Sequence, residues 1–127
     1  MGAGRGIFFG VSVGPGDPEL LTRKACRVLE ACPVIGAAQT ARGEQLALSI
    51  ARRAVDLTGK EILSLPFSMA RDLSVRQAAW RRAAAMVRQV LDRGQDVAMV
   101  VLGDVSIYST YCYLMELLRE EGYETEM

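Results

Sequence analysis

Two glycine-containing turns hold the residue types of this sequence that are best suited to bind a ligand: "GPGDP" at 14–18 and "GDVSIYST" at 103–110. Glycine-rich turns that follow strands often bind phosphate, because several backbone N–H groups converge on the anion. The first turn is a poor phosphate site, because Pro15 and Pro18 have no N–H to donate. Neither turn is a Walker loop, and "GAGRG" precedes the first apolar run instead of following it, so a dinucleotide fingerprint is absent as well.

The chemistry of the two turns favours a neutral or cationic ligand. They present backbone carbonyls and carboxylates, which accept hydrogen bonds from N–H and O–H donors. An adenosine, an amino group or a sulfonium fits such a surface better than a triphosphate does. Taken singly, these polar residues have a plainer interpretation as helix caps. The polar side chains of the turns are Asp17, Asp104, Ser106, Ser109 and Thr110.

The segments that must position these turns alternate between strands and helices. Apolar runs without alternation are typical of strands that are covered on both faces. Such runs alternating with helical patterns predict an α/β fold with a mainly parallel sheet, flanked by helices and joined by right-handed crossovers. Strands are predicted at 6–13, 33–37, 61–67 and 96–103.

Capping residues predict where the helices begin and end. Asp17 is predicted to cap a first helix that has Pro18 at its first position. A second helix is predicted at 43–55, and Ser74 with Gln77 forms a capping box for a third. Glycines are predicted to end the last two helices. The helical stripes predicted to face the core are Leu21, Ala25, Val28, Leu29 and Cys32; Ala79, Ala83, Met86, Val87 and Val90; and Tyr111, Leu114, Met115 and Leu118, with Gly94 and Gly122 as the stops.

Composition excludes several classes of function. The chain has 127 residues, enough for one domain over 1–127, and it carries 15 basic and 15 acidic residues. This balance argues against a nucleic-acid binder, and no apolar run approaches the ~20 residues that span a bilayer. The absence of histidine excludes a histidine-ligated metal and an imidazole-dependent triad, and no metal site is expected. Three cysteines without a CxxC pair are interpreted as buried thiols.

The end of the sequence begins a new element. "YETEM" at 123–127 starts to alternate like a fifth strand, and the sequence stops there without a turn. This pattern suggests a longer protein that continues into a further domain. A natural edge strand at a terminus is the alternative.

Two longer blocks resemble a known family. "GVSVGPGDPELLTRKACRVLEACPVI" at 10–35 and "LGDVSIYSTYCYLMELLREEGYETEM" at 102–127 are similar to the tetrapyrrole methyltransferases of siroheme and cobalamin synthesis. These enzymes use S-adenosylmethionine (SAM) and share a two-domain fold. The resemblance covers the whole chain but only the N-terminal domain of that fold. "SIYSTY" at 106–111 and "LALSIA" at 46–51 look most like the branch that methylates C-20 of precorrin-2 or its cobalt-containing form.

The resemblance also implies roles for particular residues. It makes Pro15 a wall of the SAM pocket. Val105 stands where many relatives have proline, which alters the stiffness of the second turn but removes no ligand group. The loop that contacts the methionine and ribose portions of SAM is implied to be Leu102, Gly103, Asp104 and Ile107.

The function implied is methyl transfer from SAM to C-20 of precorrin-2 or cobalt-factor II in cobalamin (vitamin B12) biosynthesis, by a cytoplasmic homodimer. Methyl transfer from a sulfonium needs little acid–base help, and no residue is identified as the base that removes the C-20 proton. Arg23, Arg42 and Arg71 are candidates to bind the carboxylates of the macrocycle. The alternatives are methylation of uroporphyrinogen-III or another precorrin, a non-catalytic nucleoside-binding domain, and a structural α/β subunit that acts through its partner surface.

Overall fold

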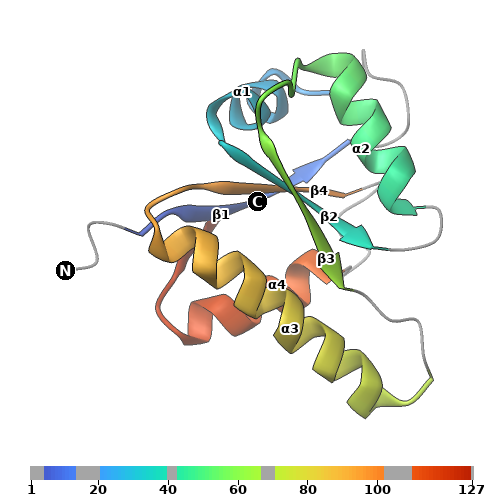
Figure 1. Cartoon of the computed structure of the whole chain (residues 1–127), viewed down its shortest axis with the longest axis vertical. Helices are drawn as coiled ribbons and strands as arrows, with labels where there is room; N and C mark the ends of the chain where they lie inside the picture. The colour runs from blue at the N-terminus through green and yellow to red at the C-terminus, as the bar shows by residue number, and fades with distance from the viewer. Residues whose placement is uncertain (1–4, 14–20, 40–42, 67–70, 102–109, 127) are drawn as a thin grey trace.

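The computed structural model describes residues 5–13, 21–39, 43–66, 71–101 and 110–126. Within these ranges strands and helices alternate along the chain, as the sequence predicts (Figure 1). The elements are β1 (Ile7–Ser12), α1 (Arg23–Ala31), β2 (Val34–Gln39), α2 (Gly43–Ala54), β3 (Glu61–Pro66), α3 (Leu73–Asp92), β4 (Val97–Val101), α4 (Thr110–Glu120) and β5 (Glu124–Glu126).

The strands form one five-stranded sheet in the order β3-β2-β4-β1-β5. Each of its strand pairs is parallel, so the predicted α/β class with a mainly parallel sheet is confirmed. The "YETEM" pattern is also confirmed as a fifth strand, because β5 pairs with β1 from Ile7↔Glu124 to Phe9↔Glu126. β4 lies in the middle of the sheet, and all five of its residues are buried.

The helices form two layers because the direction of the crossovers reverses once. From β1 through β2 to β3 the chain moves toward one edge of the sheet, and from β3 through β4 to β5 it moves back to the other edge. Right-handed crossovers in opposite directions place their helices on opposite faces. Accordingly α1 and α2 cover one face, and α3 and α4 cover the other (Figure 1). Each face has its own cluster of buried apolar side chains.

The predicted start of the first helix is wrong. α1 begins at Arg23, and its N-cap is Thr22, whose Oγ1 accepts the N–H of Ala25 at 3.0 Å. Leu21 and Thr22 precede the helix, so a continuous helix from Pro18 is excluded. Leu21 fits the apolar stripe of the helix, and the pattern therefore extended the helix too far. Asp17 itself lies outside the described residues.

The capping box predicted for the third helix is also wrong. α3 begins at Leu73, and its N-cap is Asp72. The Asp72 carboxylate accepts the backbone N–H of Ser74 at 2.9 Å and the Ser74 hydroxyl at 2.8 Å. These hydrogen bonds hold the pKa of Asp72 below its ordinary value. Ser74 therefore lies inside the first turn, where it donates to the cap instead of acting as the cap.

The predicted ends of the last two helices are confirmed. Gly94 and Gly122 have φ angles of 83° and 89°, a left-handed conformation that glycine adopts without strain. Beyond Gly122, the Tyr123 ring lies under the Arg5 guanidinium at 4.4 Å, and its hydroxyl donates to Asp92 at 2.6 Å. These contacts fasten the chain that enters β1 to the chain that leaves α3.

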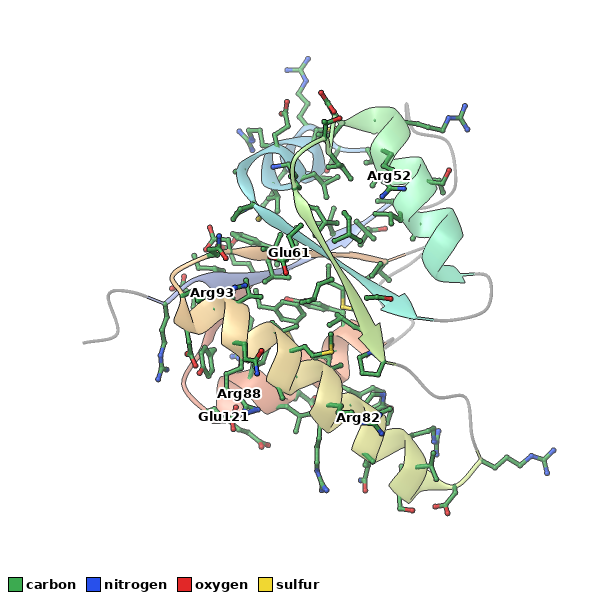
Figure 2. The ribbon with its side chains drawn as sticks, in the orientation of Figure 1. Arg52, Glu61, Arg82, Arg88, Arg93 and Glu121 are labelled. Carbon is green, nitrogen blue, oxygen red and sulfur yellow. The ribbon has the colours of Figure 1, made fainter. Side chains whose placement is uncertain are left out.

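Ion pairs join neighbouring elements at the surface (Figure 2). Arg88 of α3 pairs with Glu121 after α4, with 3.1 Å between Nε and Oε1. Arg93 at the end of α3 lies 3.7 Å from Glu61 at the start of β3. Exposed pairs of this kind contribute less than about 1 kcal/mol each, so the two apolar clusters carry most of the stability.

The interpretation of the cysteines as buried thiols holds for one of the three. Cys32 is buried, whereas Cys26 and Cys112 are partly exposed, and all three are free. Burial raises the pKa of the Cys32 thiol to about 12; the nearby Asp96 carboxylate adds to the shift and Lys60 opposes it. Within the described ranges, no helix has the length and apolar character needed to cross a membrane.

Two glycines provide a test of the packing. A Cβ on Gly6 would lie 2.0 Å from the backbone oxygen of Gln95, whereas a Cβ on Gly59 has no neighbour within 4 Å and only a φ of +85° to strain it. We expect Gly59→Ala to cost about 1 kcal/mol of unfolding free energy. Gly6→Ala must displace backbone and should cost about 3 kcal/mol. Urea unfolding of the two variants checks this, and equal costs would contradict the packing described here.

Candidate functional site

The ends of two neighbouring strands form the frame of the candidate site. β1 and β4 pair in parallel from Phe8↔Val97 to Ser12↔Val101. One residue beyond β1, the N–H of Val13 donates to the carbonyl of Val101 at 2.9 Å. The chain therefore leaves both strands at adjacent points on the carboxyl edge of the sheet. These are the points after which the sequence places "GPGDP" and "GDVSIYST".

This pair of strand ends coincides with the reversal of the crossovers. The chain leaving β1 enters α1 on one face of the sheet, and the chain leaving β4 enters α4 on the other face (Figure 1). β2, the other neighbour of β4, is followed by α2 on the α1 side. In open parallel sheets ligands bind beyond the carboxyl ends of strands, where adjacent connections diverge to opposite faces. The topology therefore favours the end of β4 as a ligand site.

The residues predicted to contact SAM fall outside the described parts of the chain. Arg42 does as well, and no position is assigned to any of them. Arg23 and Arg71 are described, and both are exposed. Arg23 is the first residue of α1, and Arg71 precedes the N-cap of α3, so both lie on the same edge of the sheet as the ends of β1 and β4. The SAM-contact residues concerned are Pro15, Leu102, Gly103, Asp104 and Ile107.

Tyr111 anchors the start of α4, a role that the sequence did not indicate. Its side chain is fully buried, and its ring centroid lies 4.8 Å from that of Phe8. Its hydroxyl lies 3.2 Å from the carbonyl oxygen of Phe8 and 2.5 Å from that of Glu126. One side chain thus joins α4, β1 and β5. The helix that follows the second turn is thereby held against the strand that precedes the first turn.

Gly10 in the middle of β1 makes room for this ring. A Cβ at position 10 would lie 2.7 Å from the Tyr111 ring, closer than packing allows. A glycine inside a strand often marks such a close approach. The sequence contains both partners of this contact, Gly10 and the tyrosine at the end of "SIYSTY". No local pattern, however, indicates that the two residues meet.

The electrostatics of Tyr111 suit a structural donor. Burial is the main cause that raises its pKa, and the hydroxyl therefore stays protonated in the folded protein near neutral pH. It is bonded to backbone carbonyls, so we assign it a positioning role and no part in proton transfer. Among the residues that the structure describes, no group of histidine, cysteine, aspartate and glutamate side chains is arranged to hold a metal ion.

A hollow of about 400 Å³ lies away from this edge, at the turn between α2 and β3. Lys60 in its wall donates to the carbonyls of Glu30 and Cys32, at 2.8 and 2.7 Å. These bonds satisfy carbonyls at the end of α1, so the lysine is already used for structure. The Lys60 ammonium therefore gives this hollow no free charge with which to bind a ligand.

Comparison with known proteins identifies similar chains. Residues 8–127 match the family described as tetrapyrrole (corrin/porphyrin) methylases. The chain is 37% identical over 120 residues to a "Probable cobalt-precorrin-2 C(20)-methyltransferase" of Methanocaldococcus jannaschii, covering 94% of this chain and 50% of that protein. It is 33% identical over 114 residues to the "Cobalt-precorrin-2 C(20)-methyltransferase" of Salmonella typhimurium, covering 87% of this chain and 47% of that protein. The chain thus spans about half the length of these relatives.

A solved structure has the same fold. The X-ray structure of a cobalt precorrin-4 methyltransferase superimposes with a TM-score of 0.68 at 22% identity, over 94% of this chain and 44% of that one. At this identity the likeness concerns the fold alone. The arrangement of strands and helices is therefore shared with that enzyme.

Removal of one hydroxyl tests the Tyr111 joint. Tyr111→Phe keeps the ring over Gly10 but leaves the carbonyls of Phe8 and Glu126 without this donor. We expect the free energy of unfolding at pH 7 to fall by about 1–2 kcal/mol. The matched control is Tyr113→Phe, on a side chain that is 42% exposed, which should cost little. If Tyr111→Phe and Tyr113→Phe lower the free energy of unfolding in urea equally, the proposed anchoring role of the Tyr111 hydroxyl is contradicted.

The pH dependence of stability, compared between wild type and Tyr111→Phe, tests the burial of the Tyr111 hydroxyl. The folded pKa lies above the ordinary value of 10.0, so above pH 10 the unfolded chain releases a proton that the folded chain retains. The contribution of this group is fully present below pH 10 and is lost as the pH rises beyond it. Wild type should therefore lose up to about 1.4 kcal/mol more stability per pH unit than Tyr111→Phe above pH 10. Parallel pH–stability curves would contradict this.

Proposed function

Because this chain belongs to the tetrapyrrole (corrin/porphyrin) methylases, we propose that it is the N-terminal half of a SAM-dependent methyltransferase. The proposed reaction is methylation of C-20 of precorrin-2 or cobalt-factor II in cobalamin biosynthesis. Two relatives at 37% and 33% identity that carry the name cobalt-precorrin-2 C(20)-methyltransferase support this choice of substrate. We also propose that the protein works as a cytoplasmic homodimer.

The observation that carries the proposal is the hydrogen-bonded pair of strand ends at Val13 and Val101. Both motif turns leave the sheet from this pair, at the position where parallel α/β sheets bind ligands. The turns carry carbonyl groups and the Asp104 carboxylate, and these fit the donors of an adenosine and a methionine amino group, as well as the positive charge of a sulfonium. The hydrogen-bond acceptors of the two turns therefore match the donors and the positive charge of SAM.

The residues of this chain have a binding and orienting task. SAM supplies an activated methyl group when it is bound. We propose that Pro15 forms a wall of the pocket. The residues proposed to hold the methionine and ribose portions are Leu102, Gly103, Asp104 and Ile107. Orientation of donor and acceptor carbon can supply several kcal/mol of the rate enhancement.

The described elements next to this loop are held together by one side chain. Tyr111 holds the start of α4 against β1. We propose that Arg23 and Arg71, with Arg42, bind carboxylates of the macrocycle, because guanidinium groups form bidentate bonds to carboxylates. Arg23 and Arg71 are exposed on the appropriate edge of the sheet. No described residue is assigned as the base that takes the C-20 proton.

Charge removal at Asp104 tests the binding of SAM. In the full-length enzyme, Asp104→Asn keeps the shape of the side chain but loses a charged acceptor. We expect the Kd for SAM in isothermal titration to rise by about tenfold or more, with little change in Tm. Asp56→Asn, at the remote α2–β3 turn, is the matched control and should bind SAM normally. If Asp104→Asn binds normally and only Asp104→Ala melts early, Asp104 is a helix cap.

Separation of the halves tests the proposed domain organisation. If SAM binds in a cleft completed by a second domain, residues 1–127 alone lack many of its contacts. A loss of ~3 kcal/mol weakens binding by about a hundredfold. We therefore expect weak SAM binding and no methylation of precorrin-2 or cobalt-factor II by residues 1–127, beside an active full-length protein. Turnover by this chain at the full-length rate would reject the two-domain proposal.

A further inference from the structure

β5 is held by specific side-chain contacts at both of its ends. The strand has three residues, pairs only with β1 at one edge of the sheet, and buries none of its side chains fully. Apolar burial therefore contributes little to holding it in place. Immediately before Glu124, the buried Tyr123 contacts Arg5 through its ring and Asp92 through its hydroxyl. At the other end of the strand, Glu126 is held by two further contacts.

Glu126 contacts one helix from each layer. Its carbonyl oxygen accepts a hydrogen bond from the hydroxyl of Tyr111 in α4 at 2.5 Å. Its carboxylate lies 3.8 Å from the ammonium of Lys24 in α1, measured between Oε1 and Nζ. These are the two helices that come after β1 and β4, the strands whose ends frame the candidate site. The end of β5 is therefore tied to both sides of that frame.

β5 also points toward the ligand edge of the sheet. It runs parallel to β1, and Glu126 shares the register position of Phe9. β1 continues from there to Ser12. A strand advances about 3.3 Å per residue, so a chain that continues in the direction of β5 reaches the level of Ser12 within about 10 Å. The contacts of Glu126 thus direct the chain toward the place where β1 and β4 end.

We propose that Lys24 and Glu126 are positioning residues for the ligand edge. Their ion pair, together with the hydrogen bond from Tyr111, fixes the direction in which the chain leaves β5 relative to α1 and α4. The inference rests on the two-domain methyltransferase proposed above, in which the part after β5 completes the SAM cleft. Neither Lys24 nor Glu126 is assigned a contact with SAM or with the tetrapyrrole.

A positioning role predicts that this ion pair matters more to the reaction than to folding. Both side chains are about half exposed, and exposed pairs add little to stability. Misorientation of the methyl donor and its acceptor carbon, in contrast, lowers the rate directly. The effect of breaking the pair should therefore appear in the kinetics at nearly unchanged Tm.

Reversal of the ion pair in the full-length enzyme tests the inference. Lys24→Glu and Glu126→Lys each replace an attraction by a repulsion, whereas the double variant restores the attraction with the signs exchanged. We expect each single variant to lower kcat/KM for SAM by about fivefold, the upper range for an exposed pair. The double variant should return to within about twofold of wild type. The hydroxyl of Tyr111 is less suited to this test, because it also bonds to Phe8.

The matched control is the ion pair of Arg93 with Glu61. Its separation of 3.7 Å and its exposure are similar to those of the Lys24 pair. Because Glu61 begins β3, the control pair lies at the amino edge of the sheet, away from the candidate site. Arg93→Glu makes the same change of charge as Lys24→Glu and should change Tm to a similar extent, yet leave kcat/KM within about twofold of wild type. Equal losses of kcat/KM in Arg93→Glu and Lys24→Glu would overturn the inference.

Two other results would also overturn the positioning role. Single variants with the kcat/KM of wild type would show that the pair orients nothing that the reaction needs. Failure of the double variant to recover would indicate that Lys24 or Glu126 contacts a ligand directly, for example a macrocycle carboxylate beside Arg23. Wild-type activity separates this inference from the proposed function. Absence of methyl transfer by wild type rejects the proposed function and the role that rests on it, whereas an active wild type with unaffected variants rejects the positioning role alone.

Discussion

The parallel pairing of β1 with β4 is the contact on which the rest of this fold depends. β4 is buried along its whole length, so each of its backbone N–H and carbonyl groups must find a partner inside the protein. It finds them on both sides, where Phe8 of β1 and Val34 of β2 share the register position of Val97. The two strands that are linked by α1 are thereby separated by a strand that comes much later in the sequence. The crossovers must reverse direction as a consequence, and the helices divide between two faces.

The same pairing creates the candidate ligand edge. The hydrogen bond from Val13 to Val101 brings the carboxyl ends of β1 and β4 together, and the helices that follow these strands, α1 and α4, lie on opposite faces of the sheet (Figure 1). Tyr111 then holds the start of α4 against β1. Its ring needs the missing side chain of Gly10, and its hydroxyl reaches Phe8 and Glu126. A ligand bound at the ends of these strands needs such a fixed frame, because misplacement of a reacting group is costly to the rate.

The two helical layers differ in what they leave at the surface. α1 and α2 bury their apolar stripes against the sheet. α3 does so over much of its length, but it begins with exposed Leu73 and Val75, and Trp80 stacks on Tyr113 of α4. The groove between α3 and α4 is lined by basic side chains from α3 and acidic side chains from α4. The candidate ligand edge and this groove therefore lie on different parts of the molecule.

Local patterns in the sequence were sufficient for the class of fold and for most elements. The non-alternating runs around Phe8 and Met99 predicted buried parallel strands, and Gly94 and Gly122 marked two helix ends. These signals come from neighbouring residues, so they can be recognised without a structure. The family motifs around the two turns were recognisable for the same reason. The SAM-binding role of residues in those turns remains a prediction.

Tertiary structure decided what depends on contacts between distant segments. Several residues near each helix start are able to cap, and only the docked helix selects Thr22 or Asp72. The strand order, the meeting of Gly10 with Tyr111 and the stacking of Trp80 on Tyr113 are likewise absent from any local pattern. The physical reason is that periodicity reports which face of a segment is buried. It does not report which other segment buries that face, because that choice depends on packing across the whole core.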